Sequence, residues 1–287
     1  MRFDPSILLL PFLPSLVSAW HPPTLQGYNL VWYDEFEGSP QTLPSVSRWN
    51  IINGKLNVNN ELETYTSSTK TIHVSGGHTL QIVPWRQQNG NGDWISGRIE
   101  STYTFTPPAG KKTVAQAEIR FGSNPTNTKA GIWPAFWLLG QELRSGGSWP
   151  ACGELDILET VNGDLRGYGT LHCGTYPGGP CNEPNGRGAS TAIPNQDWHT
   201  WKIEWDRTSG DWWTSKITWY MDGVKFHEVS GQSIGDSAIF DKISNKPLFF
   251  ILNVAVGGNW PGYPNVNTLD GPGSMMEVGY VAHYVSN

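Results

Sequence analysis

Hydrophobic and polar residues alternate along several short segments of the chain with the period of a β-strand. Within 200–205, Trp201, Ile203 and Trp205 are apolar, and the residues between them are polar or charged. A period of two places the apolar side chains on one face of a strand and the polar ones on the other. This segment is therefore predicted to be a strand with one buried face.

Other segments extend this prediction to most of the chain. Asp222-Gly223 lies between two such segments, where this dipeptide is a strong signal for a β-hairpin. Residues 247–256 are apolar at nearly every position, as expected for a central strand covered on both faces. Helical periodicity is confined to a short piece within 231–243. Shorter apolar runs occur near 79–83, 114–121, 132–139 and 153–159.

The spacing and composition of these segments favour one fold class. Many short strands separated by Gly, Pro and Asn turns are typical of a sandwich of two antiparallel sheets. The roughly 265 residues of 20–287 suit one large β domain better than two small ones. We therefore expect an all-β sandwich with a single domain over 20–287.

Composition excludes several other classes of protein. The chain has 19 Lys plus Arg and 25 Asp plus Glu, a formal net charge of −6, and 12% aromatic residues. A coiled coil would be rich in Ala, Glu, Lys and Leu, and a disordered chain would lack aromatic residues. A nucleic-acid-binding protein would usually be basic. We expect a globular protein that binds no nucleic acid.

The first 19 residues have the features of a secretory signal peptide. Arg2 supplies a positive charge, residues 7–17 are mostly apolar, and Val-Ser-Ala at 17–19 is a small-residue site of the kind that signal peptidase cuts after. A membrane anchor is the alternative, but this apolar run is shorter than the ~20 residues that span a bilayer. We expect a secreted protein without membrane association, whose mature chain starts at Trp20.

Two of the three cysteines bracket a short loop rich in Gly and Pro. Cys173 and Cys181 are predicted to form a disulfide, which would contribute ~2.5 kcal/mol by restricting the unfolded chain. Cys152 begins an apolar segment and is expected to be a buried thiol. No Cys-His cluster has the spacing of a metal site, so we expect no metal and no cofactor.

The segment GELDILETVN at 153–162 carries Glu154, Asp156 and Glu159 among leucine and isoleucine residues. Burying an unpaired charge is expensive, so acids in an apolar strand need an explanation. A regular strand would turn Glu154 and Asp156 to one face and Glu159 to the other, because five is an odd separation. One β-bulge between Asp156 and Glu159 would bring all three to one face. The alternative is an edge strand whose acids are solvated or paired.

Carboxyl groups on a common face can carry out glycoside hydrolysis. One attacks the anomeric carbon as a carboxylate, and another donates a proton to the leaving oxygen. A third acid helps to separate their pKa values, because a nearby negative charge raises the pKa of a neighbouring acid. A retaining mechanism needs the working pair about 5–5.5 Å apart, but Glu154 and Glu159 are farther apart along a flat strand. The hypothesis therefore requires a curved strand with converging side chains.

Aromatic residues occur in two segments beside this chemistry, GIWPAFWLLG at 131–140 and NVAVGGNWPG at 253–262. Trp133, Trp137 and Trp260 are candidates to stack on sugar rings, and packing in the core is the alternative for each. The other large apolar residues of the first segment are assigned to the core: Phe136, Leu138 and Leu139.

Together these segments resemble the laminarinase-like branch of glycoside hydrolase family 16. The similarity runs from about 34 to 284 and rests on ELDILE, GIWPAFWLL, YGTLH, WHTWKIEW, WYMDG and ILNVAVGGNWPG. The acidic motif has two residues, Ile157 and Leu158, directly before its last Glu, and this length is typical of the bulged form of this branch. The resemblance implies a β-jelly roll with a concave sheet that forms an open cleft. It also implies internal cleavage of β-1,3- or β-1,3/1,4-glucan with retention.

The resemblance assigns roles to individual residues. Glu154 would be the nucleophile, Asp156 the assisting acid and Glu159 the general acid/base. Trp133 and Trp137 would line the glycone side of the cleft.

Three polar residues fall where the family places contacts to its substrate: Asn59, Arg98 and His172. Each has a structural alternative. Asn59 could cap a turn, and Arg98 could pair with Glu100 or Glu118. His172 could be a packing residue.

The chain departs from the family pattern at two places. Family members often bind a structural calcium through an Asp in the last strand, where this chain has Gly279, so we expect no calcium there. The loop 172–188, which the predicted disulfide would pin, is long and could alter the sugar preference on the aglycone side.

The leading hypothesis is therefore a secreted, monomeric endo-β-1,3-glucanase whose partner is its polysaccharide substrate. One alternative keeps the fold but changes the reaction to β-1,3-galactan cleavage or transglycosylation. Another is a lectin-like carbohydrate-binding domain without turnover. The three acids argue against the last alternative, because a binding groove does not need ELDILE.

Overall fold

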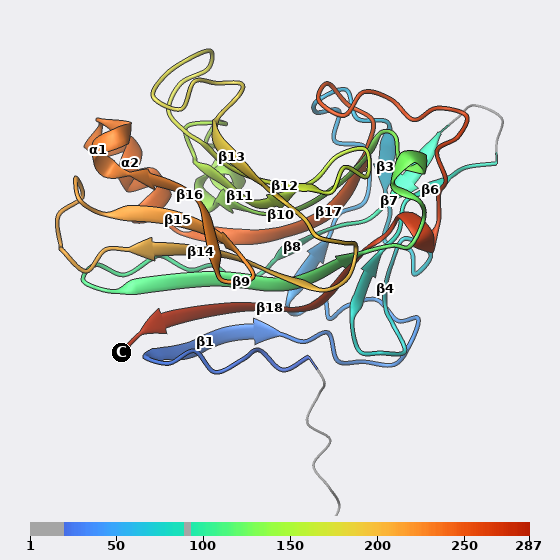
Figure 1. The fold of residues 1–287 in the computed structure, drawn as a ribbon, viewed down its shortest axis with the longest axis horizontal. Helices are drawn as coiled ribbons and strands as arrows, with labels where there is room; N and C mark the ends of the chain where they lie inside the picture. Colours follow the sequence, from blue (N-terminus) through green and yellow to red (C-terminus); the bar gives the residue numbers. More distant parts are fainter. Residues whose placement is uncertain (1–19, 89–92) are drawn as a thin grey trace, which may run out of the picture.

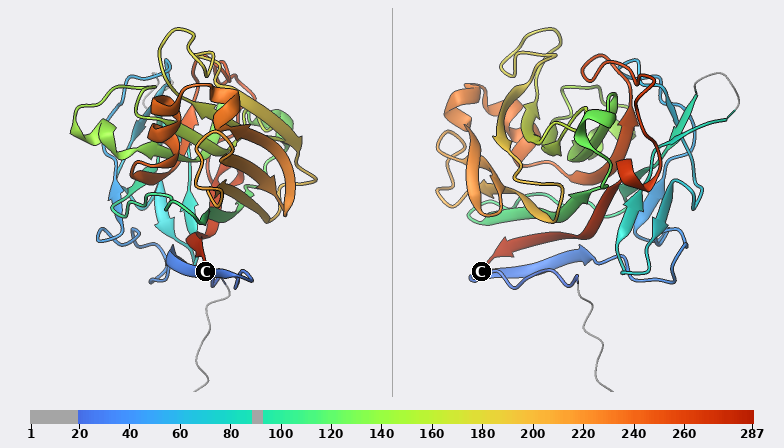
Figure 2. Two further views of the ribbon diagram at one scale, coloured as in Figure 1. Left: turned by 90° about the vertical axis from the view of Figure 1, so that its left-hand side faces the viewer. Right: turned by 45° about the vertical axis from the view of Figure 1, so that its right-hand side comes forward.

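The structure, a computed structural model, describes residues 20–88 and 93–287. The predicted signal peptide at 1–19 lies outside the described residues. Within the described chain, two large antiparallel sheets form a sandwich, which confirms the predicted all-β fold (Figure 1). Figure 2 shows the two layers from two other directions.

The first layer consists of eight of the described strands. Strand β18 (Met276–Ser286) pairs along one edge with β9 (Lys112–Phe121), while β1 (Tyr28–Asp34) and β5 (Leu80–Ile82) share its other edge. Strand β4 pairs with β5, and a further row continues outward from β9. These remaining strands are β4 (Ile72–Val74), β14 (His199–Asp206), β15 (Lys216–Met221) and β16 (Val224–Ser230).

The second layer contains the acidic segment near its middle and is curved (Figure 1). Its order in the described chain is β13 (Arg187–Ala192), β12 (Arg166–His172), β11 (Glu154–Glu159), β10 (Ile132–Gly140), β17 (Leu248–Val256), β8 (Arg98–Ser101) and β2 (Trp49–Ile51).

A small sheet and short helices complete the described fold. The small sheet comprises β3 (Glu63–Tyr65), β7 (Trp94–Ser96) and β6 (Trp85–Arg86). The helices are α1 (Gly231–Ile234), α2 (Ser237–Ser244) and the 3-10 turns η1 (Thr126–Thr128), η2 (Gln141–Ser145) and η3 (Pro272–Ser274). Both α-helices begin within the predicted helical piece. None of the described helices is long and apolar enough to span a membrane.

Alternation along β14 follows the sequence prediction. Trp201, Ile203 and Trp205 are fully buried, whereas the residues between them are partly exposed. The Asp222-Gly223 turn joins β15 to β16, and all nine residues of β17 are buried. The predicted half-buried strand, hairpin and central strand are confirmed.

Indole rings from the first layer fill the space between the sheets, and glycines of the second layer make room for them. A Cβ atom at Gly167 would lie 2.1 Å from the Trp201 ring, and one at Gly169 would lie 2.6 Å from the Trp219 ring. Side chains larger than glycine do not fit at either position. Positions 167 and 169 of β12 are thus glycine because the opposite sheet supplies bulky rings there.

The cysteines are arranged as predicted. Cys173 and Cys181 form a disulfide, and Cys152 is a buried free thiol. Burial raises the pKa of the Cys152 thiol to about 11, which keeps it uncharged.

The residue in the last strand at which the family resemblance implies a calcium ligand is covered by a ring from the start of the described chain. A Cβ atom at Gly279 would lie 2.3 Å from Trp20 Cε3. The Trp20 ring also packs on Trp198 at 4.2 Å, and its Nε1 donates a hydrogen bond to the Gly77 carbonyl. Position 279 offers no side-chain oxygen and Trp20 fills the adjacent space. These residues do not fit a calcium ion held from this position.

Candidate active site

The acidic strand β11 contains the predicted bulge. Against β10, Asp156 pairs with Trp137 and Leu158 with Phe136, so Ile157 is an extra residue. The register with β12 also shifts between Asp156 and Glu159. In a regular strand, the odd separation between Glu154 and Glu159 would place them on opposite faces. The extra residue compensates for this, so Glu159 turns to the same face as Glu154 and Asp156.

A tryptophan of the opposite sheet supports the bulge from behind. Trp219 Nε1 donates a hydrogen bond of 2.7 Å to the backbone carbonyl of Asp156. A bulge interrupts the ladder and leaves backbone groups that need other partners. The fully buried Trp219 supplies one at the residue before the bulge.

Strand β12 brings a second set of side chains to the acidic face. Glu154 lies opposite His172, Asp156 opposite Thr170 and Glu159 opposite Tyr168. Because Gly167 and Gly169 face the core, the alternating residues of β12 must face the acids.

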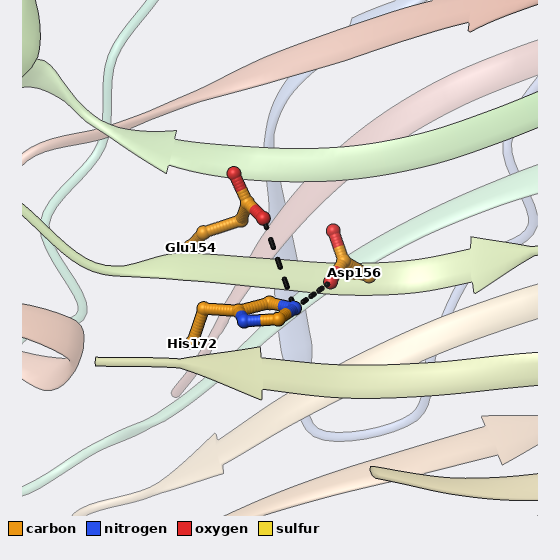
Figure 3. Close-up of side chains that lie close together, drawn as sticks. All are labelled: Glu154, Asp156 and His172. Carbon is orange, nitrogen blue, oxygen red and sulfur yellow. Dashed lines mark ion pairs between the residues drawn. The ribbon is translucent and has the colours of Figure 1, made fainter. Parts of the chain in front are cut away.

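His172 directs one ring nitrogen toward two of the carboxyl groups (Figure 3). Its Nε2 is 3.5 Å from Asp156 Oδ2 and 3.9 Å from Glu154 Oε1. On the other side of the ring, Nδ1 is 2.7 Å from Glu183 Oε2. His172 is therefore part of the charged group and not a packing residue of the core.

The two outer acids differ in their surroundings. The pKa of Glu159 is raised to about 7, first by burial and then by the charge of Glu154, while a 2.9 Å hydrogen bond from Trp133 Nε1 limits the rise. Burial also raises the pKa of Glu154, but positive His172 and a hydrogen bond from Trp149 oppose that rise. Stabilisation of the carboxylate form is therefore stronger at Glu154.

Asp156 stands between them and is 3% exposed. Burial, followed by the charges of Glu159 and Glu154, raises its pKa well above the usual range. Its Oδ2 atom has no hydrogen-bond partner among the described residues. Its surroundings thus favour the neutral form of Asp156, which lies between the two outer acids in the strand.

An aromatic group borders the Glu159 side. Trp260 is 44% exposed and meets the Trp133 ring edge-on at 5.5 Å and the Tyr168 ring at 5.0 Å. Trp133 is only partly buried, so neither tryptophan is an ordinary core residue. The structure therefore places Trp133 and Trp260 beside the acids, as the stacking hypothesis requires.

Trp137 and Arg98 lie next to each other in the same sheet. The Arg98 guanidinium is 4.9 Å from the centre of the Trp137 ring and pairs with Glu100 at 2.7 Å. Trp137 Nε1 donates a 2.7 Å hydrogen bond to Asn253. The ion pair that was the alternative role for Arg98 is present, with Glu100 as the partner. The Arg98 charge also opposes the rise in the pKa of Glu154.

Asn59 lies at the margin of the aromatic group. Its side chain is exposed and donates to Glu61, and its carbonyl accepts a hydrogen bond from Asn259, the neighbour of Trp260. With φ at 51°, Asn59 adopts the left-handed turn conformation that asparagine tolerates well. Asn59 is therefore part of a turn, and its side chain remains accessible to solvent.

Several residues of the site were not predicted from the sequence: Glu183, Trp149, Tyr168 and Asn253. Tyr168 is two residues before Thr170 on an alternating strand, so the β12 pattern could have indicated it. Glu183 lies in an irregular loop, where no periodicity points to its partner.

Glu154, Asp156 and His172 also place one potential metal-ligand atom each within 4.8 Å of one another. A histidine must be unprotonated at the nitrogen that binds a metal. Here burial lowers the pKa of His172, but the hydrogen bond to Glu183 and the charges of the neighbouring carboxylates outweigh burial, and the net rise favours the protonated ring. We therefore assign the group to acid–base chemistry.

Comparisons with known proteins agree with this geometry. The family described as "Glycosyl hydrolases family 16" matches residues 96–278. A solved endo-1,3-beta-glucanase from Streptomyces sioyaensis is 37% identical, with a TM-score of 0.86 over 93% of this chain and 99% of that one. The endo-beta-1,3-glucanase structure from Pyrococcus furiosus is 31% identical, with a TM-score of 0.71 over 91% and 95%.

Curated relatives include longer proteins. The Rhodothermus marinus "Beta-glucanase" is 30% identical over 90% of this chain and 85% of its own length. The Niallia circulans "Glucan endo-1,3-beta-glucosidase A1" is 30% identical over 91% of this chain, which spans only 38% of that protein. With a family match over most of its length and these relatives, the chain belongs to glycosyl hydrolase family 16.

Proposed function

We propose that this protein cleaves β-1,3-glucan internally, by a retaining double displacement. The observation that carries the proposal is the bulged β11, which presents three carboxyl groups of different pKa on one face of the curved sheet. Membership of family 16, and the β-1,3-glucanase names of its relatives, support glucan as the substrate class.

In the first step, the Glu154 carboxylate attacks the anomeric carbon while the bond to the leaving oxygen breaks. Glu159 gives its proton to that oxygen. A pKa of about 7 keeps Glu159 protonated in mildly acidic solution, as an acid catalyst requires. The result is a covalent glycosyl ester on Glu154.

In the second step, Glu159 is a carboxylate and accepts a proton from water. The water oxygen attacks the same carbon, and the bond to Glu154 breaks. Asp156 remains neutral beside both acids, so it adds no negative charge next to the nucleophile. Glu154 and Glu159 thus return to their starting states.

We infer that Trp133, Trp137 and Trp260 hold the sugar rings along this face. An indole presents an apolar surface to the C–H face of a sugar and a polar N–H at its edge. The N–H groups of Trp133 and Trp137 are already bonded to Glu159 and Asn253, which orients the rings. Asn59, Arg98 and His172 supply polar groups near them.

We propose that the protein acts outside the cell, after removal of residues 1–19. The Cys173–Cys181 disulfide supports an oxidising compartment. In this view residues 20–287 are one catalytic domain that works as a monomer on polysaccharide.

The test compares wild type with Glu154→Gln and Glu159→Gln on laminarin, lichenan and β-1,3-galactan, by reducing-sugar release and product analysis. We expect both variants to lose oligosaccharide release. Glu228→Gln removes a carboxylate that pairs with lysines on β15 and β16, and should retain wild-type activity. Full activity in either active-site variant contradicts the assigned roles. Wild-type release from galactan alone, or growth of longer products, contradicts glucan hydrolysis.

A further inference from the structure

Glu183 is a buried acid that belongs to no strand. It lies in the loop 173–186, two residues after Cys181, and its side chain is fully covered. One oxygen accepts a 2.9 Å hydrogen bond from the Cys173 backbone N–H. The other is 2.7 Å from His172 Nδ1. With both oxygens engaged and no exposed surface, Glu183 cannot touch a sugar.

Contacts other than those of the Glu183 side chain also hold the loop in shape. The disulfide closes it, reciprocal backbone hydrogen bonds join Gly178 to Glu183, and Arg187 Nε donates to the Pro180 carbonyl. These contacts together define the path of the loop. The contact of Glu183 Oε2 with His172 is made in addition to these contacts within the loop.

The contact with Glu183 determines which nitrogen of the His172 ring faces the other acids. A carboxylate only accepts hydrogen bonds, so the Nδ1 atom next to Glu183 carries a proton. The opposite nitrogen, Nε2, then faces Asp156 at 3.5 Å and Glu154 at 3.9 Å. This is the arrangement in which a buried acid orients a histidine through one nitrogen so that the other serves the reaction.

The electrostatics agree with that geometry. Burial lowers the pKa of His172, but the hydrogen bond to Glu183 and the charges of Glu154, Glu183 and Glu159 outweigh it, so the net shift is upward. In turn, the positive His172 lowers the pKa of Glu154. Charge on the imidazole thus favours the ionised nucleophile.

We propose that Glu183 is a positioning residue for the hydrolytic centre, which holds His172 with Nε2 toward Asp156 and Glu154. The disulfide loop carries this residue into the site. The role rests on the proposed glycoside hydrolysis, since His172 matters only if Glu154 is the nucleophile.

The main variant is Glu183→Gln, which has nearly the same shape. It can keep an oxygen toward Cys173 but turns an amide donor toward Nδ1, which then has to accept. Loss of a supporting partner typically costs metal-bound histidines about 10- to 100-fold, and we expect kcat on laminarin to fall in that range with little change in KM. Arg187→Ala removes a clamp of the same loop without touching His172, and should keep the wild-type kcat.

A double-mutant cycle with His172→Asn separates positioning from a general structural effect. If Glu183 acts through the imidazole, Glu183→Gln has no further effect on kcat once His172 is replaced. Independent, additive losses, or a wild-type kcat in Glu183→Gln, overturn the proposal. Should Glu183→Gln fail to fold, Glu183→Asp keeps the acid but withdraws it from Nδ1, and the same cycle applies with a smaller loss expected.

An activity-independent measurement distinguishes this proposal from the proposed function. Imidazole NMR of the full chain, with His172 assigned by difference from His172→Asn, reports its tautomer and pKa. We expect the His172 pKa to fall in Glu183→Gln, and an unchanged pKa and tautomer contradict the proposal. If wild type shows the predicted imidazole behaviour but releases nothing from any glucan, the proposed function fails and the Glu183–His172 contact stands.

Discussion

The bulge that unites the acids should depend on a residue in the opposite sheet. Trp219→Phe removes the indole N–H that bonds to the Asp156 carbonyl and leaves that buried oxygen without its donor. An unsatisfied buried group costs about 1–3 kcal/mol. The smaller ring also leaves roughly 40 Å³ empty, which adds about 1 kcal/mol at ~24 cal/mol per Å³. We expect a loss of unfolding free energy of about 2–4 kcal/mol.

Two other tryptophans of the same sheet provide matched controls, because all three are fully buried. Trp205 Nε1 donates to the Ile243 carbonyl at 2.9 Å, in helix α2 and not in the bulge. Trp201 Nε1 has no hydrogen-bond partner among the described residues. Trp205→Phe should therefore cost as much stability as Trp219→Phe, whereas Trp201→Phe should cost about 1 kcal/mol.

The assay combines thermal unfolding with steady-state kinetics on laminarin. At about 2–4 °C per kcal/mol, the Tm should fall by roughly 4–16 °C for the first two variants and by about 2–4 °C for Trp201→Phe. Only Trp219→Phe should lower kcat, by about tenfold or more, because a small displacement of reacting groups is costly. Equal Tm losses in all three variants refute the hydrogen-bond argument. A wild-type kcat in Trp219→Phe refutes the support of the bulge.

Two further predictions concern pH. The kcat/KM should fall tenfold per unit as pH rises above about 7, where Glu159 loses its proton, and a fall that already starts near 4.5 in a laminarin rate profile would contradict this. Burial lowers the pKa of His283 to about 4, so the unfolded chain takes up a proton near pH 6.5 before the folded one does. Stability is therefore present above pH 6.5 and decreases by up to about 3 kcal/mol toward pH 4. Denaturation at several pH values should show a flatter slope for His283→Asn, which does not titrate there, and an unchanged slope would contradict it.

The features that could be predicted from the sequence are those that depend on the spacing of residues along one strand. The parity of positions 154, 156 and 159, together with the cost of burying charge, required a bulge, and register pairs with both neighbouring strands confirm it. Alternation in β14 likewise predicted which side chains are buried. These inferences succeed because a strand has a fixed period, which the sequence displays directly.

Contacts between the layers could not be read in this way. Trp201, Trp205 and Trp219 look alike as inward aromatic residues, yet only Trp219 bonds to the bulge. Its acceptor lies 63 positions away in the other sheet, so no local pattern indicates the contact. Glu183 meets His172 across an irregular loop without any period. For Arg98, the sequence left Glu100 and Glu118 open as partners, and the structure has Glu100, two positions along the same strand.

The balance of charge in the site depends on Glu183, one of the residues that the sequence did not predict. Four acids, Glu154, Asp156, Glu159 and Glu183, surround one imidazole, and so many negative charges would repel one another in a buried place. Raised pKa values favour the protonated forms of Asp156 and Glu159, and Glu183 forms an ion pair with His172. In the proposed mechanism the remaining carboxylate is Glu154, where a double displacement needs the negative charge. Under the proposal for Glu183, the disulfide loop supplies the acid that favours a positive imidazole, and this charge in turn favours the ionised form of Glu154.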